Sequence, residues 1–246
     1  MRKLFSTSAE ARKTDLRLEP VGRRLFLRMA GAAAATTSLV VAGCSQDSLT
    51  EQVAARGGAR IAAGVDLGAG EIGILNYAYA LEQLEAAFYD MVMKMPYGGM
   101  NDEERMILKA LRDHEVVHRE FFRKLLGSNA IPDLEVDFSA VNFRDRISVL
   151  TTARTFEDLG VGAYNGAGKY LMLPKNLVAA GKIVSVEARH AAIIRYLLAP
   201  KTGHFAGFDV VNDGTGLDLA LEPTEVLPKA QAFIKTPITA RHFPTA

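Results

Sequence analysis

Apolar residues recur at helical spacing along four long stretches of the chain. Positions three, four and seven residues apart share one face of a helix, so each stretch predicts a helix with one buried side. The four predicted helices span about 71–95, 101–126, 142–173 and 174–199. No stretch shows the sustained alternation of a strand. The pattern therefore predicts an all-α fold built around four helices.

Several helix ends carry capping signals. Asn101 is followed three residues later by Glu104, a variant of the capping box, and Gly127 stands where a C-terminal cap belongs. Pro174 fits the first turn of the fourth helix. The third helix contains four glycines in its second half, which weakens the prediction there. They are Gly160, Gly162, Gly166 and Gly168.

Residues 1–44 resemble an export signal. Arg23-Arg24 precedes a mildly apolar run from Met29 to Gly43, and this pair resembles the twin-arginine type of signal. The run has 15 residues, fewer than the roughly 20 that a membrane-spanning helix needs, and it suits the apolar region of a cleaved signal. It ends in Val41-Ala42-Gly43-Cys44, which resembles a bacterial lipobox with Cys44 as the lipidated residue. The alternative is that Cys44 is an ordinary small residue near a cleavage site.

These features predict four parts of the chain. Residues 1–44 are the signal, 45–70 a flexible tether, 71–200 a helical bundle, and 201–246 an irregular C-terminal arm that packs along the bundle. One short helix is expected near Thr224 to Ile234. The lipobox resemblance implies an exported protein, periplasmic or in the cell envelope, that is anchored to a membrane by an N-terminal lipid.

Composition excludes several classes of function. The 246 residues carry a formal net charge of +1, and the charges are mixed along the chain, so no basic stripe indicates nucleic acid as a partner. A single Cys excludes an intrachain disulfide framework and a Cys-rich zinc site.

Each predicted helix places a glutamate in the middle of its apolar face. The four are Glu82, Glu115, Glu157 and Glu187, and His118 and His190 follow the second and the last by three residues. Buried carboxylates are costly without cations. Glu, Glu-x-x-His, Glu, Glu-x-x-His in chain order is the ligand set with which a four-helix bundle holds two metal ions. We therefore predict a dinuclear metal site in the core.

The spacing repeats between the two halves of the bundle. Tyr89 follows Glu82 by seven residues, and Tyr164 follows Glu157 by seven residues. Two similar helix pairs are consistent with a metal site on a pseudo-twofold axis.

Charge and ligand type indicate which metals suit the site. Four glutamates balance two divalent cations if both histidines are neutral. Carboxylate-rich sites with one imidazole per metal suit iron, with manganese as the alternative.

Four motifs together resemble the ferritin-like domain family, closest to exported bacterial members that are similar to desiccation-related proteins. The motifs are ILNYAYALEQLEAAFY, LRDHEVVHREFFRKLLG, TFEDLGVGAYNGAG and VSVEARHAAIIRYLL. The resemblance implies a left-handed four-helix bundle with one long crossover between its second and third helices, and a diiron centre. It also implies that Glu115 and Glu187 bridge both metals. By the same resemblance Glu82 and His118 complete one metal site, and Glu157 and His190 complete the other.

Other residues near the site receive different interpretations. Tyr89 and Tyr164 are interpreted first as core aromatics. The alternative is a redox or hydrogen-bonding role beside the metals, for which Tyr89 is our candidate catalytic residue. Glu85 is interpreted as a neighbour or boundary residue of the site. Asp113 and His114 are predicted to face away from it. His204 and His242 in the arm are predicted to lie on the surface.

The sequence leaves three functions open. The first is Fe(II) oxidation with dioxygen or peroxide in protection of the envelope. The second is peroxide dismutation at a manganese centre. The third is a non-catalytic, desiccation- or stress-related envelope protein in which metal only stabilises the bundle. A homodimer is also left open.

Overall fold

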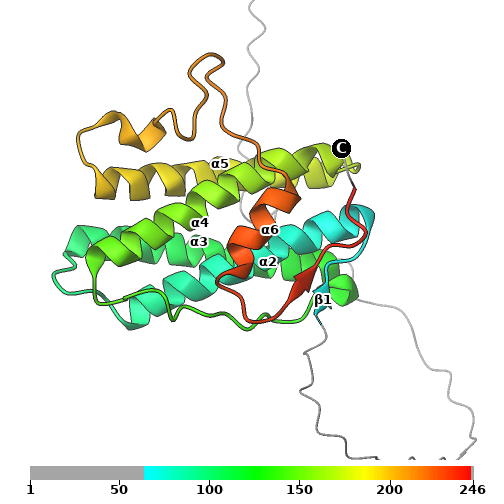
Figure 1. The fold of residues 1–246 in the computed structure, drawn as a ribbon, viewed down its shortest axis with the longest axis horizontal. Coiled ribbons are helices and arrows are strands. Elements are labelled where there is room, and N and C mark those ends of the chain that lie inside the picture. Colours follow the sequence, from blue (N-terminus) through cyan, green and yellow to red (C-terminus); the bar gives the residue numbers. More distant parts are fainter. Residues whose placement is uncertain (1–63, 245–246) are drawn as a thin grey trace, which may run out of the picture. The chain divides into compact units, whose positions relative to one another are not determined.

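The computed structural model describes residues 64–244. The predicted export signal with Cys44, and residues 45–63 of the predicted tether, lie outside the described residues. Helices and strands are labelled as in Figure 1.

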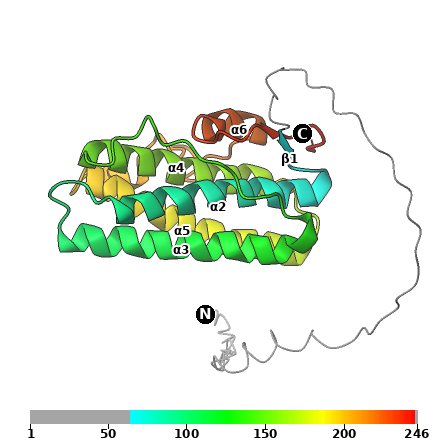
Figure 2. The ribbon, with the colours of Figure 1, turned by 90° about the horizontal axis from the view of Figure 1, so that it is seen from below.

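Four long helices form the bundle, and the all-α prediction is confirmed (Figures 1 and 2). They are α2 (Gly70–Lys94), α3 (Asp102–Leu126), α4 (Arg146–Ala167) and α5 (Pro174–Leu198). The closest pairs are α2 with α3 and α4 with α5. Three short 3₁₀ turns, η1 (Gly127–Asn129), η2 (Gly168–Tyr170) and η3 (Gly203–Ala206), follow three of the helices.

The capping signals act as the sequence predicts. The Asn101 side chain accepts a hydrogen bond from the Glu104 N–H at 2.9 Å, and the Glu104 side chain accepts one from the Asn101 N–H at 3.3 Å. Gly127 ends α3 with a φ of 56°, a conformation that glycine adopts without strain. Pro174 occupies the first turn of α5.

The predicted bounds of the third helix, 142–173, are wrong at both ends. The helix begins at Arg146, because the Asp145 carboxylate accepts hydrogen bonds from the N–H groups of Ile147 and Ser148 and so fixes the N-terminus. It ends at Ala167 and continues only as the turn η2. Pro174 disfavours helical geometry at the residue before it, which keeps α4 and α5 separate.

The connection from α3 to α4 runs the length of the bundle. Arg146 Nε donates to Glu104 Oε1 at 2.7 Å, which places the start of α4 beside the start of α3. Phe138 and Phe143 in this connection each pack on Phe88 with ring centroids 5.8 Å apart. The long crossover is thus held to the core by aromatic contacts.

The C-terminal arm packs along the bundle. Its helix α6 (Pro223–Gln231) lies across α4 and α2 (Figures 1 and 2). Just before α6, the Leu221 N–H donates to the Gly162 carbonyl at 2.9 Å. A Cβ on Gly166 would lie 1.9 Å from the Leu221 carbonyl oxygen, so only glycine permits this approach. Two of the four glycines that weakened the helix prediction, Gly162 and Gly166, are therefore contact points for the arm.

A short parallel pair of strands ties the arm to the start of the domain. β1 (Val65–Asp66) pairs with β2 (Ile238–Thr239), and Leu67 is fully buried. Residues 65–67 at the end of the predicted tether are therefore tied to the folded domain, while the bundle itself begins at Gly70, next to the predicted start at residue 71. Among the helices described, none combines the length and the apolar character required to cross a bilayer.

Candidate metal centre

The structure brings the six candidate ligands together in the middle of the bundle. Glu82 comes from α2, Glu115 and His118 from α3, Glu157 from α4, and Glu187 and His190 from α5. All four carboxylates are fully buried. The six residues form two overlapping sets, and within each set four ligand atoms lie within 4.8 Å of one another.

The first set surrounds His118. Its Nδ1 lies 2.8 Å from Glu187 Oε1, 3.5 Å from Glu82 Oε2 and 3.6 Å from Glu115 Oε2. One imidazole nitrogen and three carboxylate oxygens therefore converge on one point.

The second set surrounds His190 and mirrors the first. Its Nδ1 lies 2.7 Å from Glu115 Oε1, 3.4 Å from Glu187 Oε2 and 3.5 Å from Glu157 Oε2. Glu115 and Glu187 thus each direct one oxygen toward each histidine. Glu82 and Glu157 each serve a single set.

The chemistry of the cluster fits bound metal cations. Buried donor and acceptor atoms in proteins almost always have hydrogen-bond partners. Here the ligand atoms that face the centre are buried and have no hydrogen bond of acceptable geometry, despite their short separations. They are Glu82 Oε2, both oxygens of Glu115 and Glu187, Glu157 Oε2, and Nδ1 of His118 and His190. Lone pairs that converge in this way are satisfied by metal ions bound between them.

A comparison with known protein families agrees with this geometry. Residues 70–200, more than half of the chain, match the ferritin-like domain family. The chain belongs to that family. The search among curated proteins found no match.

In the ferritin-like domain without metal, the cluster holds protons. Burial raises the pKa of Glu157 to about 8, and it raises that of Glu82 well above the usual range. Burial alone would lower the pKa of His118, but its contacts with Glu115, Glu187 and Glu82 outweigh it and raise the pKa to about 12. Burial would likewise raise the pKa of Glu115, yet the two histidines lower it to about 2. The metal-free cluster is therefore a network of imidazolium groups, carboxylates and neutral acids.

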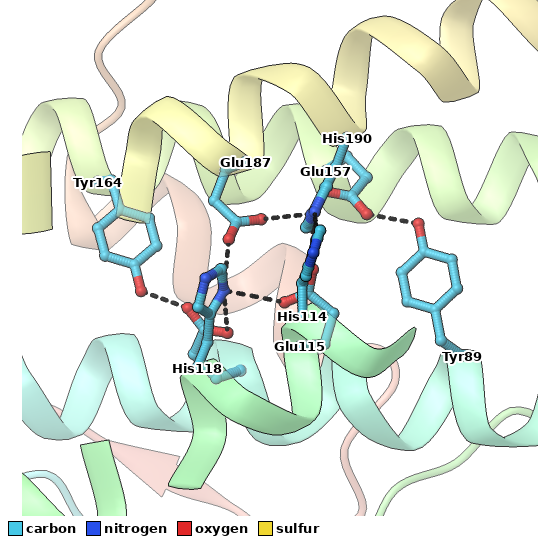
Figure 3. A network of polar contacts seen from close by, with 9 residues as sticks. Tyr89, His114, Glu115, His118, Glu157, Tyr164, Glu187 and His190 are labelled. Atoms are coloured by element: carbon cyan, nitrogen blue, oxygen red, sulfur yellow. Dashed lines mark hydrogen bonds and ion pairs between the residues drawn. The ribbon is translucent and has the colours of Figure 1, made fainter. Parts of the chain in front are cut away.

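The two tyrosines of the repeat contact opposite ends of the cluster (Figure 3). Tyr89 on α2 donates its hydroxyl hydrogen to Glu157 Oε1, and Tyr164 on α4 donates to Glu82 Oε1. Each bond engages the oxygen that faces away from the centre and leaves Oε2 directed inward. The tyrosines thus orient the two carboxylates that serve a single set. The catalytic role suggested for Tyr89 stays a prediction.

His114 does not face away from the site, and that prediction is wrong. Its Nδ1 lies 2.9 Å from Nε2 of His190, and the two rings stack with centroids 5.1 Å apart. Metal-binding histidines usually hydrogen-bond through their second nitrogen, and His114 is that partner for His190. Asp113 does face away, because Lys109 and Arg112 hold it at the surface.

Glu85 is buried beside the cluster and belongs to neither ligand set. A Cβ on Gly160 would lie 3.1 Å from Glu85 Oε1, so the glycine on α4 makes room for this side chain. Burial, followed by the charges of Glu115 and Glu187, raises the pKa of Glu85 well above the usual range. Glu85 is thus a neutral acid inside the bundle. In the arm, His242 is exposed as predicted, whereas His204 is half-buried.

Proposed function

We propose that this ferritin-like domain binds two metal ions and oxidises Fe(II) with dioxygen or peroxide. The observation that carries the proposal is the division of oxygens at Glu115 and Glu187, each of which directs one oxygen to each histidine. Glu115 and Glu187 would therefore contribute to holding both ions. Glu82 with His118 would help to hold one ion, and Glu157 with His190 the other.

The side chains around the ions would balance the charge of the metals, hold the carboxylates in position and release protons when metal binds. Four carboxylates balance two divalent ions only if both histidines are neutral, so metal binding must displace the imidazolium protons. Tyr89 and Tyr164 hold Glu157 and Glu82 with one oxygen inward. Bound metal ions would supply the redox chemistry and the position where the oxidant binds.

The overall reaction balances with peroxide as the oxidant. Two Fe(II) ions lose one electron each, and one peroxide molecule takes up both electrons and two protons to give two water molecules. Iron suits the donor set because oxygen and imidazole ligands dominate it, and manganese is the alternative with similar preferences.

The test compares metal content and turnover in matched variants. The wild-type chain should bind about two metal ions, measured by mass spectrometry after loading with iron or manganese. The Glu115→Ala, Glu187→Ala variant should bind none and should oxidise Fe(II) no faster than buffer. Glu85→Gln is the control, because this residue is buried near the cluster but belongs to neither ligand set.

The other outcomes are equally informative. Oxygen release from peroxide by the manganese-loaded protein, without accelerated Fe(II) oxidation, would identify a peroxide dismutase instead. Metal that raises the melting temperature while no oxidant is consumed would leave a structural site. Equal Fe(II) oxidation by wild type and the double variant would contradict the proposal outright.

Tyr89 can be tested against its counterpart. If Tyr89 only orients Glu157, Tyr89→Phe and Tyr164→Phe should lower the rate of Fe(II) oxidation by similar factors. A loss of turnover confined to Tyr89→Phe, with both metal ions still bound, would assign Tyr89 a direct part in the reaction.

We further propose that the protein is exported and anchored to a membrane through lipid on Cys44, where it protects the envelope from oxidants. The support lies in the sequence of residues 23–44. Fractionation of cells should find the wild-type chain in the membrane and Cys44→Ser in the soluble periplasmic fraction. An unchanged distribution would contradict the lipid anchor.

A further inference from the structure

A cavity lies between α4, α5 and the C-terminal arm, beside the carboxylate cluster. Its volume is about 560 Å³, and residues of α4, α5 and the C-terminal arm line it. This volume falls within the range of ligand-binding pockets, about 300–1,000 Å³. None of the six candidate metal ligands lines it.

Small side chains on the helices create the space, and the arm roofs it. Gly162, Ala188, Ala191 and Ala192 lie along its helical wall. Phe205, Leu219 and Leu221 of the arm cover it from the other side. On α4 the lining extends from Arg154 to Gly162, which corresponds to roughly 12 Å along the helix axis.

The cavity has a polar end and an apolar end. Arg154 and Asp158 line the first part of its α4 wall, whereas Val161 and Gly162 line the last part. Arg195 lies level with Asp158, because its Nε donates to Asp158 Oδ1 at 2.7 Å. At the opposite end Leu221 contacts Gly162.

Arg195 is a structural cation that faces two carboxylates. It is 2% exposed, and it donates to both oxygens of Asp158 at 2.7 and 2.8 Å. It also donates to both oxygens of Asp209 at 3.0 and 2.8 Å. These bonds attach the arm to α4 and α5 at the polar end of the cavity.

Two further cations line the cavity without such partners. Neither Arg154 nor Lys229 forms an ion pair within residues 64–244. The segment containing α6 leads from Leu221, beside Gly162, to Phe233, whose ring packs 4.8 Å from that of Phe156, so Lys229 lies toward the Arg154 end. The lining as a whole holds three cations and three carboxylates and is therefore neutral. At the polar end Arg154, Arg195 and Lys229 outnumber Asp158 and Asp209 by one positive charge. The exposed Asp218 lies toward the other end, since the carbonyl of the next residue, Leu219, accepts a hydrogen bond from Asn165 on α4.

We propose that this cavity binds a small amphiphilic carboxylate, with its anionic group between Arg154 and Lys229 and its apolar chain toward Gly162 and Leu221. The single excess positive charge at the Arg154 end favours an anionic head group, and the apolar end favours a linear hydrocarbon body. This site is independent of the proposed metal chemistry, since the two sites share no lining residue.

Decanoate is the probe, used with the full-length chain below the concentration at which it aggregates. Isothermal titration calorimetry should show saturable binding of about one molecule per chain. Decanol has the same apolar body without a charge and should bind about tenfold more weakly, and decyltrimethylammonium should bind more weakly still. Absence of saturable binding, or equal binding of the cation, would overturn the proposal.

Three variants locate the site. Arg154→Ala should weaken decanoate binding about tenfold, and Ala192→Phe should abolish it by filling the cavity. Arg189→Ala is the matched control, because Arg189 is an exposed arginine on α5 that does not line the cavity. Decanoate binding that Arg154→Ala and Arg189→Ala weaken equally would show attraction to net charge only. Melting curves verify folding, and should Ala192→Phe not fold, the Arg154→Ala result decides alone.

Discussion

The two halves of the carboxylate cluster have the same ligands in different surroundings. Each half contains one histidine, one carboxylate of its own and a share of two others. The His190 side chain is 4% exposed and has His114 behind it, whereas the His118 side chain is 12% exposed. The residue of α5 that corresponds to His114 by its position before the glutamate is Val186, which has no polar side chain.

A second difference lies between α2 and α4. Glu85 follows Glu82 by three residues, and the residue at the same distance from Glu157 is Gly160. The two positions face each other, and the glycine accommodates the larger side chain. The six candidate ligands thus follow the twofold repeat, whereas the residues around them do not. We expect the two proposed metal sites to differ in affinity for that reason.

The largest expected effect is a change in metal content when a carboxylate that belongs to only one half of the cluster is removed. Glu82→Ala and Glu157→Ala should each reduce metal content from about two ions per chain to about one. Glu115→Ala should affect both halves, because its two oxygens are divided between them. Native mass spectrometry gives the stoichiometry. Loss of both ions in Glu82→Ala and Glu157→Ala alike would show that the halves cannot be loaded separately.

The next largest effect is a pH dependence of the stability of the metal-free protein, caused by the shifted pKa values of the cluster. The raised pKa of Glu157, about 8, means that its contribution to stability is present below its ordinary value of 4.5 and is lost as pH rises through 8. His118 acts in the same direction between 6.5 and about 12. Glu115, with a pKa lowered to about 2, loses its contribution only below pH 4.5.

The metal-free protein should therefore become less stable from pH 5 to pH 9. Each kcal/mol lost lowers the melting temperature by about 2–4 °C for a domain of this size. Metal binding displaces the same protons, so the gain in melting temperature on adding metal should widen as pH rises. Calorimetry with chelator and with metal at pH 5, 7 and 9 measures both. A gap that narrows with pH would be inconsistent with proton displacement.

His114 tests whether the halves differ in affinity. Removing the hydrogen-bonding partner of a metal-bound histidine typically lowers metal affinity about 10- to 100-fold. His114→Ala should therefore weaken binding at the His190 half alone, whereas Val186→Ala should leave both affinities nearly unchanged. Competition titrations with a chelator resolve the two binding steps. Equal effects of the two substitutions would remove His114 from its supporting role.

The smallest effect tests the contact between Gly160 and Glu85. Gly160→Ala gains helix propensity of about 1 kcal/mol, but crowding of the Glu85 carboxyl costs about 1–3 kcal/mol, so the domain should lose about 1 kcal/mol. In a Glu85→Ala background the same substitution should stabilise the domain. Denaturant unfolding of the four proteins gives the coupling between the sites. The same sign in both backgrounds would mean that the glycine does not serve Glu85.

The sequence by itself determined the four helices and the six clustered side chains. The helical period places each glutamate on a buried face, and a histidine three residues later shares that face. Capping residues such as Asn101 and Gly127 act over one turn, so their effect can also be read locally.

Which residues surround the cluster could be learned only from the tertiary structure. His114 directly precedes Glu115 and so lies about 100° around α3 from it; its contact with His190 exists only because α3 packs against α5. The glycines of α4 look like helix breakers in sequence, yet Gly160 accommodates Glu85 and Gly166 accommodates the arm. The cavity under the arm depends on contacts such as Arg195 with Asp209, and no local pattern encodes the path of a chain that folds back over a finished bundle.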